Sequence, residues 1–454
     1  MNNNNITSNK DILFKKRAYE RLNLIFGENN FTEIDPLLKN NDTYAEVLTA
    51  FGYINNSPAY VFSQDIDRDF GAMSSAQISK ICKLYDLASK TGYPIIGIYD
   101  SIGAKIGEYN SILQSYGNLL LKVNNLSGLV PQISIILGSC LGSNALLASC
   151  SDFVIMSKNA KFGIETNAKN SSCDFAVKAG NCHFMTKNDE HAINIAKQLV
   201  SILPSNNLSY TNIDKVKPSY ELDIKNSEKY SQKETIISLF DDSKFLELQS
   251  EFGQTISIGF SKLEGRTVCI AISNSNVNNG ILDSKSCTKL ARIASFCDAF
   301  SIPLITFIES KGFESLKDAA KLSNVYAEAT NVKITIITGS IYGSTYIALG
   351  SKGSNSDITF AWESAIISAL LPEASIEILY EDRIKNLKNP LIEKPELIKE
   401  YINTHASPYY AAEQGYIDDV ISIDGTRVKL CYTIEMLCNK RVQNIPKKHS
   451  NIQV

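Results

Sequence analysis

The first half of the chain alternates segments with helical and with strand periodicity. Segment 74–92 places apolar residues at the spacing of one helix face, namely Ile78, Ile81, Cys82, Tyr85 and Ala88. Ser74 or Ser75 can cap the start of this helix, and Gly92 can end it. The segments that follow predict a buried strand at 93–101, a helix at 109–124 and a strand at 131–138.

The second half repeats this order of elements. A helical stripe covers 283–300, where Asp283 or Ser284 can cap the start, and strand patterns follow at 301–312 and 331–340. Strands that alternate with helices predict an α/β fold with a mainly parallel sheet in each half. Between the halves, segment 204–233 is rich in Asn, Ser and Lys and predicts a connecting segment.

Each half carries a pair of glycines between a strand and a helix. Gly138 and Gly142 recur 201 positions later as Gly339 and Gly343. Element order and glycine spacing recur together, so the sequence predicts an internal duplication.

A strand, a glycine turn and a helix leave backbone N–H groups free at the start of the helix. The second glycine of each pair lets a ligand approach the main chain closely. The candidate donors, which suit an oxyanion, lie at Gly142-Ser143 and at Gly343-Ser344-Thr345. One preorganised donor contributes about 2.7–4 kcal/mol to stabilising a developing enolate. Tight packing of helix against sheet is the alternative explanation of the glycines, and neither turn has phosphate-loop spacing.

Composition narrows the classes of function. The 454 residues suit two domains, and a net charge of −3 without a basic, aromatic-rich run argues against nucleic-acid binding. The ten cysteines form no Cys-x-x-Cys pair and the four histidines lie far apart, so no metal site is expected. The polar N-terminus lacks the apolar core of a signal peptide, and no apolar run is long enough to span a bilayer. We therefore expect a cytoplasmic protein without a direct membrane span.

Many collinear segments resemble one family. The matching segments include 16–35, 60–88, "DSIGAKIGE" at 100–108, 201–207, 260–270, 291–309, 326–337, "SPYYAAEQGYIDDVI" at 407–421 and 440–454. Together they resemble the carboxyltransferase subunits of biotin-dependent acyl-CoA carboxylases, of the acetyl- and propionyl-CoA carboxylase beta type, and the related acyl-CoA decarboxylase alpha subunits. The resemblance covers nearly the whole chain.

The resemblance implies two duplicated crotonase-like domains, each with one oxyanion hole. It places an acyl-CoA domain at 11–210, a linker at 211–233 and a biotin domain at 234–454. Carboxybiotin arrives in this family on a separate carrier protein, and biotin carboxylase is a further subunit. Biotin and the thioester each develop an enolate, so two backbone holes are needed and no side-chain base. The family forms homo-oligomers, hexamers among them, in which two subunits build each active site.

The family's functional positions transfer residue by residue. The first hole falls on Gly142 and Ser143, and the second on Gly343, Ser344 and Thr345. The family's glycine-rich CoA segment falls on Asp100 to Lys105, with Gly103, Ala104 and Lys105 as binding residues, and Ile347 takes an acyl-pocket position. The resemblance implies carboxyl transfer to a short acyl-CoA, such as acetyl-CoA or propionyl-CoA.

The chain departs from the family at several of these positions. Ser143 and Ser344 replace glycines, and Thr345 replaces an alanine, so we expect Thr345 to narrow the biotin side. Lys311-Gly312-Phe313 replaces a Pro-Gly-Phe loop that is longer in the family. Two alternatives to an acyl-CoA carboxylase subunit stay open: the alpha subunit of a sodium-pumping methylmalonyl-CoA-type decarboxylase, and a non-catalytic scaffold paralogue.

Overall fold

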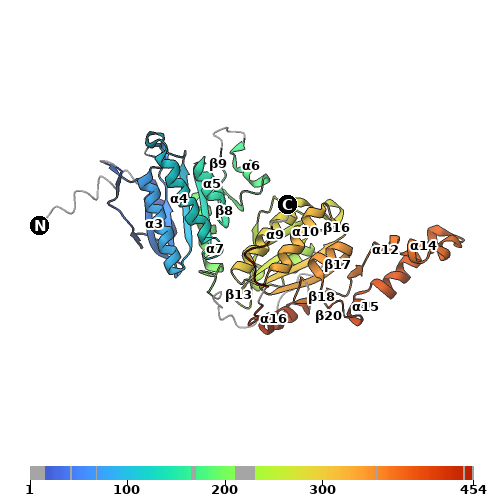
Figure 1. The fold of residues 1–454 in the computed structure, drawn as a ribbon. Coiled ribbons are helices and arrows are strands. Elements are labelled where there is room, and N and C mark those ends of the chain that lie inside the picture. The colour runs from blue at the N-terminus through green and yellow to red at the C-terminus, as the bar shows by residue number, and fades with distance from the viewer. Residues whose placement is uncertain are drawn as a thin grey trace. The chain divides into compact units, whose positions relative to one another are not determined.

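The computed structural model describes residues 16–40, 43–67, 69–164, 170–209, 231–353, 355–442 and 445–451. The chain divides into two compact units, Met1–Thr211 and Asn212–Val454 (Figure 1). Most of the expected linker 211–233 lies outside the described residues, as does the polar N-terminal segment 1–15.

An eight-stranded sheet forms the centre of the first unit, in the order β1-β4-β5-β6-β7-β8-β10 with β9 paired to β7. The pairs from β5 to β10 are parallel, whereas β1, β4 and β5 pair antiparallel. The strands are β1 (Phe31–Glu33), β4 (Leu48–Ile54), β5 (Ser57–Ser63), β6 (Ile95–Ser101), β7 (Gln132–Leu141), β8 (Phe153–Ser157), β9 (Lys161–Gly163) and β10 (Phe184–Thr186), beside a small hairpin of β2 (Lys39–Asn40) and β3 (Thr43–Tyr44).

The second unit repeats this topology. Its sheet has the order β11-β12-β13-β15-β17-β18-β20 with β19 paired to β17, and the parallel part begins at β13. The strands are β11 (Leu246–Leu248), β12 (Ile256–Leu263), β13 (Arg266–Ser273), β15 (Leu304–Ser310), β17 (Lys333–Tyr342), β18 (Ile358–Trp362), β19 (Ile366–Ser368) and β20 (Asp419–Ile421), with β14 (Ile281–Leu282) paired to β16 (Gly312–Phe313). The duplication predicted from the sequence is therefore confirmed, and it includes the short extra strand of each sheet, β9 in the first and β19 in the second.

Helix α3 (Ser75–Thr91) begins and ends where local signals predict, whereas the helix expected at 109–124 spans Ser111–Leu126. The Ser74 side chain accepts a hydrogen bond from the Gln77 N–H, and Gly92 ends the helix with a φ of 69°. Figure 1 shows α3 and α4 side by side over the sheet, and both contribute to one core cluster. The α-helices are α2 (Lys16–Phe26), α3 (Ser75–Thr91), α4 (Ser111–Leu126), α5 (Ser143–Ser149), α6 (Cys173–Lys178) and α7 (Asp189–Ile202).

Helices of the second unit follow the same plan up to α11. Asp283 caps α9 by accepting from the Ser286 N–H, and α9 packs against α10 as α3 does against α4. The α-helices are α8 (Gln232–Ile237), α9 (Ser284–Ala299), α10 (Leu316–Glu328), α11 (Gly343–Thr345), α12 (Pro372–Leu379), α13 (Glu381–Lys385), α14 (Pro390–Tyr401), α15 (Pro408–Glu413) and α16 (Thr426–Leu437), and π-helices cover Tyr346–Gly350 and Ile402–Ala406.

A group of helices distinguishes the second unit from the first. Helices α12 and α14 extend away from the second sheet (Figure 1). They have a small core of their own, formed by Ile376, Leu397, Tyr401 and Ala406. Sequence periodicity does not predict this extension, because α14 contains Pro395 and its apolar stripe is short.

Burial explains why the central strands are apolar on both faces. All seven residues of β6 are buried, and so are the first six of β7. A parallel strand that is covered on both sides has no solvent face, so consecutive apolar residues fill its middle, as at 135–137 of β7. This core fixes the ends of β6 and β7, and the polar loops begin at those ends.

Candidate functional site

The first glycine turn connects β7 to α5. Gly142 precedes the first helical residue, with a φ of 62° and a ψ of −130°, a conformation that favours glycine. Its N–H donates to the Gly163 carbonyl at 3.1 Å, and its carbonyl accepts from the N–H of Ala145 at 3.1 Å. The Ser143 N–H has no acceptor in the described part of the chain. The Asn144 N–H likewise has no acceptor there, but Asn144 is buried, whereas Ser143 is half-buried, so the Ser143 N–H is the more accessible unpaired donor of this turn.

The replacement of a family glycine by Ser143 does not remove this donor. Ser143 is not among the residues with positive φ, so its backbone suits any amino acid. Only Gly142 needs the left-handed region, and Gly142 is retained.

The second glycine turn connects β17 to α11 in the same way. Gly343 has a φ of 42°, and Thr345 lies in the ordinary helical region with a φ of −70°. Ser344 is exposed, and within the described residues its N–H has no acceptor. Ser344 therefore matches Ser143 as an unpaired donor.

Thr345 differs from the expectation drawn from the sequence. The residue is fully buried, at 0% exposure, so its side chain points into the protein and does not narrow an open biotin side. Its Oγ1 also has no hydrogen-bond partner in the described chain. The expected obstruction by Thr345 is wrong, because the start of the helix turns this position inward; the exposed side chain at this turn is that of Ser344.

The first glycine of each pair makes room for a carboxylate. A Cβ atom on Gly138 would lie 2.0 Å from Oδ1 of Asp100, and one on Gly339 would lie 2.5 Å from Cδ of Glu309. Asp100 and Glu309 occupy matching places in β6 and β15, 209 positions apart. Packing, the alternative explanation of the glycines, thus accounts for Gly138 and Gly339, while the turn conformation accounts for Gly142 and Gly343.

The two carboxylates have different partners. Asp100 accepts from Nη2 of the buried Arg21 at 2.9 Å and from the Ser139 N–H at 3.2 Å. Glu309 accepts from the Ser275 hydroxyl at 3.0 Å, and Gln232 Nε2 lies at 3.4 Å. In the described part of the chain Glu309 has no ion-pair partner, so the two copies of the motif differ in local charge.

The expected CoA-binding loop follows β6 and reaches the first glycine turn. Gly103 has a φ of 124° and lies close to the Leu141 carbonyl, since an added Cβ would be 3.4 Å from that oxygen. Its carbonyl accepts from the Met73 N–H, and a bridge pairs Met73 with Ala104. The structure thus brings the loop and the Gly142 turn together within one unit.

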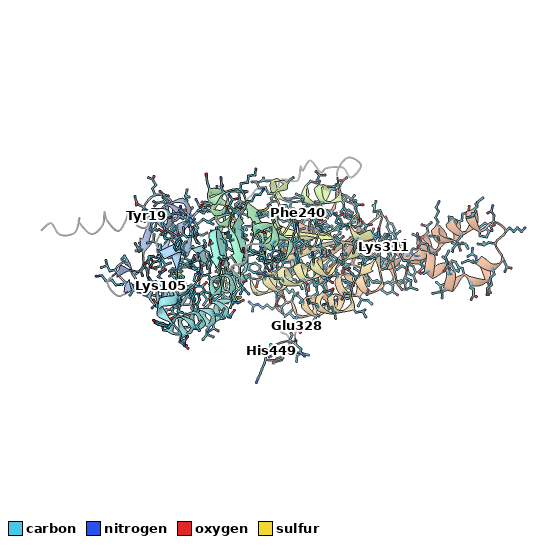
Figure 2. All side chains as sticks on the ribbon, turned by 90° about the horizontal axis from the view of Figure 1, so that it is seen from above. Tyr19, Lys105, Phe240, Lys311, Glu328 and His449 are labelled. Carbon is cyan, nitrogen blue, oxygen red and sulfur yellow. The ribbon has the colours of Figure 1, made fainter. Side chains whose placement is uncertain are left out.

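Lys105 is already engaged at the surface of this loop. Its Nζ lies 2.8 Å from Oδ2 of Asp69, and this hydrogen bond raises the pKa of Lys105. Figure 2 labels Lys105 on the first unit. Because Lys105 is partly exposed and Asp69 is exposed, solvent weakens this pair.

Ile347 lies on the π-helix that follows the second turn. Its side chain is 63% exposed, so it is available to a ligand, and its carbonyl accepts from Asn355 Nδ2 at 2.7 Å. Single π-turns occur often at functional sites. Gly343 and Ser344 of α11 and Ile347 of the π-helix therefore lie within five consecutive residues of the second unit.

Comparison with known proteins identifies the family to which this chain belongs. The carboxyl transferase domain family matches residues 15–452. The chain belongs to the carboxyl transferase family. It is 33% identical to the propionyl-CoA carboxylase beta chain of Roseobacter denitrificans over 96% of this chain and 94% of the relative. It is also 30% identical to the methylmalonyl-CoA decarboxylase subunit alpha of Propionigenium modestum, over 96% of this chain and 93% of the relative.

Solved structures of the family have the same fold. Transcarboxylase 12S, with methylmalonyl-CoA and methylmalonic acid bound, superimposes with a TM-score of 0.90 and 29% identity, covering 98% of this chain and 94% of the other. The predicted pair of crotonase-like domains is therefore confirmed, and the family relationships establish an acyl-CoA carboxyltransferase.

Membrane-spanning helices and clustered metal ligands are both missing from the described residues. No described helix combines the length and apolar character needed to cross a membrane. Among the same residues, no group of three or more His, Cys, Asp or Glu side chains could hold a metal ion.

Proposed function

We propose that this chain transfers a carboxyl group between biotin on a separate carrier protein and the α carbon of a short acyl-CoA, acetyl-CoA or propionyl-CoA. One observation carries the proposal: each unit presents an unpaired backbone N–H directly after a glycine with positive φ. Propionyl-CoA carboxylase beta chains from several organisms align over nearly the whole chain, which supports this substrate class.

In the proposed first site, Ser143 donates its N–H to the thioester oxygen as that oxygen gains charge. A fixed donor of this kind lowers the barrier by about 2.7–4 kcal/mol. Gly142 shapes the turn, and the segment from Gly103 to Lys105 binds the CoA, with Lys105 exchanging Asp69 for a phosphate group. We place this acyl-CoA domain at 11–210.

In the proposed second site, Ser344 donates its N–H to the ureido oxygen of biotin. The exposed, unpaired amide of Ser344 fits such an oxygen. The Thr345 amide is fully buried, so its contribution requires a small shift of the turn. Carboxylated biotin supplies the carboxyl group when bound. Gly343 and Ile347 border this site in the biotin domain, 234–454, which follows the linker 211–233.

We further propose a cytoplasmic homo-oligomer, a hexamer as in the family, that works with a biotin carboxyl carrier protein and a biotin carboxylase. The transcarboxylase 12S structure is described as a hexamer assembly, which supports this expectation. In such an oligomer the first domain of one subunit faces the second domain of another.

The second candidate function is the reverse reaction, in the alpha subunit of a decarboxylase. The Propionigenium modestum relative favours it, because its identity of 30% and its coverage equal those of the propionyl-CoA carboxylase carboxyltransferase subunit of Haloferax mediterranei. Both directions use the same two holes, so the partner subunits decide between them. Copurification of a soluble biotin carboxylase supports the first candidate, and copurification of a membrane-embedded decarboxylase subunit supports the second.

An activity assay of the purified chain distinguishes both catalytic functions from a non-catalytic role. We expect methylmalonyl-CoA or malonyl-CoA to lose CO2 in the presence of free biotin, and at a much lower rate in its absence. Mass spectrometry of the CoA thioesters measures the product. Equal rates with and without biotin for both substrates would contradict carboxyl transfer by this chain.

A further inference from the structure

Asn144 joins three elements of the first unit through one side chain. It is the second residue of α5, directly after Ser143, and it is almost fully buried. Its Oδ1 accepts from the Tyr116 hydroxyl of α4 at 2.9 Å. Its Nδ2 donates to Oγ of Ser101, the last residue of β6, at 2.8 Å.

Ser101 extends this connection into the loop that follows β6. Its Oγ accepts from the Gly103 N–H at 3.1 Å and lies 3.4 Å from the Gly103 carbonyl, to which its hydroxyl donates. Burial raises the pKa of Tyr116, so its hydroxyl remains a donor throughout the neutral range. The donors and acceptors therefore form a continuous chain from Tyr116 through Asn144 to Gly103.

The second unit lacks this connection although its fold is the same. Thr345 stands 201 positions after Asn144, and its buried Oγ1 has no partner in the described residues. Ser310 stands 209 positions after Ser101, and it accepts from the Gly312 N–H at 3.2 Å and donates to the Gly280 carbonyl at 3.0 Å. The serine–glycine contact is therefore common to both units, whereas the link from the helix to that contact exists only in the first.

We propose that Asn144 is a positioning residue that holds the Ser143 N–H and the loop from Gly103 to Lys105 in one fixed geometry. A buried amide whose oxygen and nitrogen each have a hydrogen-bond partner suits this role, because each lost bond would leave a buried polar atom without a partner. The proposal deepens the proposed function, since it says how the oxyanion donor and the CoA loop keep their relative placement. A displacement of about 1 Å at such a site can lower turnover about a hundredfold.

Hydrogen–deuterium exchange of the purified chain tests the connection without relying on activity. In Asn144→Ala we expect the Gly103 amide and the first turn of α5 to exchange about tenfold faster, because one hydrogen bond changes local stability by about that factor. Tyr116→Phe removes one end of the chain of bonds and should produce a smaller change at the same peptides. Tyr326→Phe is the matched control: it removes a buried hydroxyl in the second unit, where Tyr326 bonds to Thr306. Unchanged exchange at both segments in Asn144→Ala, or the same change in Tyr326→Phe, would overturn the proposal.

Steady-state kinetics of methylmalonyl-CoA decarboxylation with free biotin separates positioning from a general structural effect. We expect Asn144→Ala to lower kcat by about tenfold to a hundredfold while KM for methylmalonyl-CoA stays within about threefold. Asn144→Ala and Ser101→Ala cut the same bond, so the double variant should lose little more than the worse single variant. Fully additive losses, or kcat losses that follow the thermal midpoint in every variant, would contradict the proposal.

The two experiments distinguish this inference from the proposed function. A wild-type chain that transfers no carboxyl group, together with faster exchange in Asn144→Ala, would refute the proposed function and support the connection. Active wild-type protein, together with unchanged exchange and unchanged kcat in Asn144→Ala, would support the proposed function and refute the connection through Asn144.

Discussion

The proposed oxyanion donors, the N–H groups of Ser143 and Ser344, depend on the conformation of the backbone and not on the side chain. Each follows a glycine that carries the unusual φ, and each keeps an ordinary helical conformation itself. A side chain can therefore be added at these positions while the N–H stays available.

Replacement of Ser143 by proline should remove the donor without breaking the helix. Ser143 is the first residue of α5, a position that tolerates proline well. We expect Ser143→Pro to lower kcat for the decarboxylation of methylmalonyl-CoA with free biotin by about a hundredfold to a thousandfold, with little change in the thermal midpoint. Ser143→Gly keeps the N–H, so equal losses in the two variants would show that this amide is not a donor in the reaction.

Thr345 offers a test of stability at the same scale. Its Oγ1 is buried without a partner in the described chain, so Thr345→Val should raise the free energy of unfolding of the second unit by about 1 kcal/mol. Thr335→Val is the matched control and should lower that free energy by a similar amount, because the Thr335 hydroxyl donates to the Leu349 carbonyl at 2.7 Å. Urea unfolding measures both, and a loss of stability in Thr345→Val would mean that its hydroxyl has a partner.

At the scale of elements, a carboxylate from one strand packs against a glycine of the next strand in each unit: Asp100 of β6 lies over Gly138 of β7, and Glu309 of β15 over Gly339 of β17. Gly138→Ala should displace Asp100 from its place over β7 and disturb the pair with buried Arg21, at a cost of about 3 kcal/mol or more. Gly117→Ala is the control, since an added Cβ there meets no atom within 4 Å and alanine favours the helix. Thermal unfolding should show a lower midpoint for the first variant only; equal midpoints would mean that Asp100 moves aside freely.

A buried lysine links α9 to the segment before β12. Lys289 Nζ donates to the Phe252 carbonyl at 2.6 Å, and burial lowers the pKa of Lys289 to about 8. The unfolded chain binds more protons than the folded chain between about pH 8 and the ordinary lysine pKa, so stability from this group rises with pH in that window, by about 3 kcal/mol in all. Lys289→Met should abolish this increment. Urea unfolding at pH 7.5 and 9.5 measures it, and parallel pH profiles for the two proteins would contradict the assignment.

Sequence periodicity predicted the elements with local signals and missed those that depend on distant contacts. The caps at Ser74 and Asp283 lie beside the helices they start, so they are visible in a short window. The contact between Asp100 and Gly138 joins residues 38 positions apart, and the burial of Thr345 depends on the direction in which the helix leaves the turn. The sequence does hold one signal of the contact with Gly138: Asp100 and Glu309 occupy matching positions in the two halves, as Gly138 and Gly339 do.

At the scale of the whole molecule, the duplication places one donor in each unit, and the proposed oligomer brings donors from different subunits together. A mixture of Ser143→Pro and Ser344→Pro chains should then recover about a quarter of wild-type turnover, because random assembly pairs an intact first unit with an intact second unit that often. Each variant alone should be nearly inactive. Turnover of the refolded mixture measures the recovery, and no recovery in a mixed oligomer would place both donors of a site in one chain.

The carboxylate above the first glycine of each pair also limits how these sequences can diverge. A Cβ at Gly138 or Gly339 would collide with Asp100 or Glu309, so the glycine and the acid cannot change independently. Relatives with alanine at either glycine position should carry a small or neutral residue at the acidic position. Aligned homologues would therefore show paired substitutions at positions 100 and 138, and again at positions 309 and 339. Positions 142 and 343 would show no such pairing with an acidic residue, because their own backbone conformation constrains them.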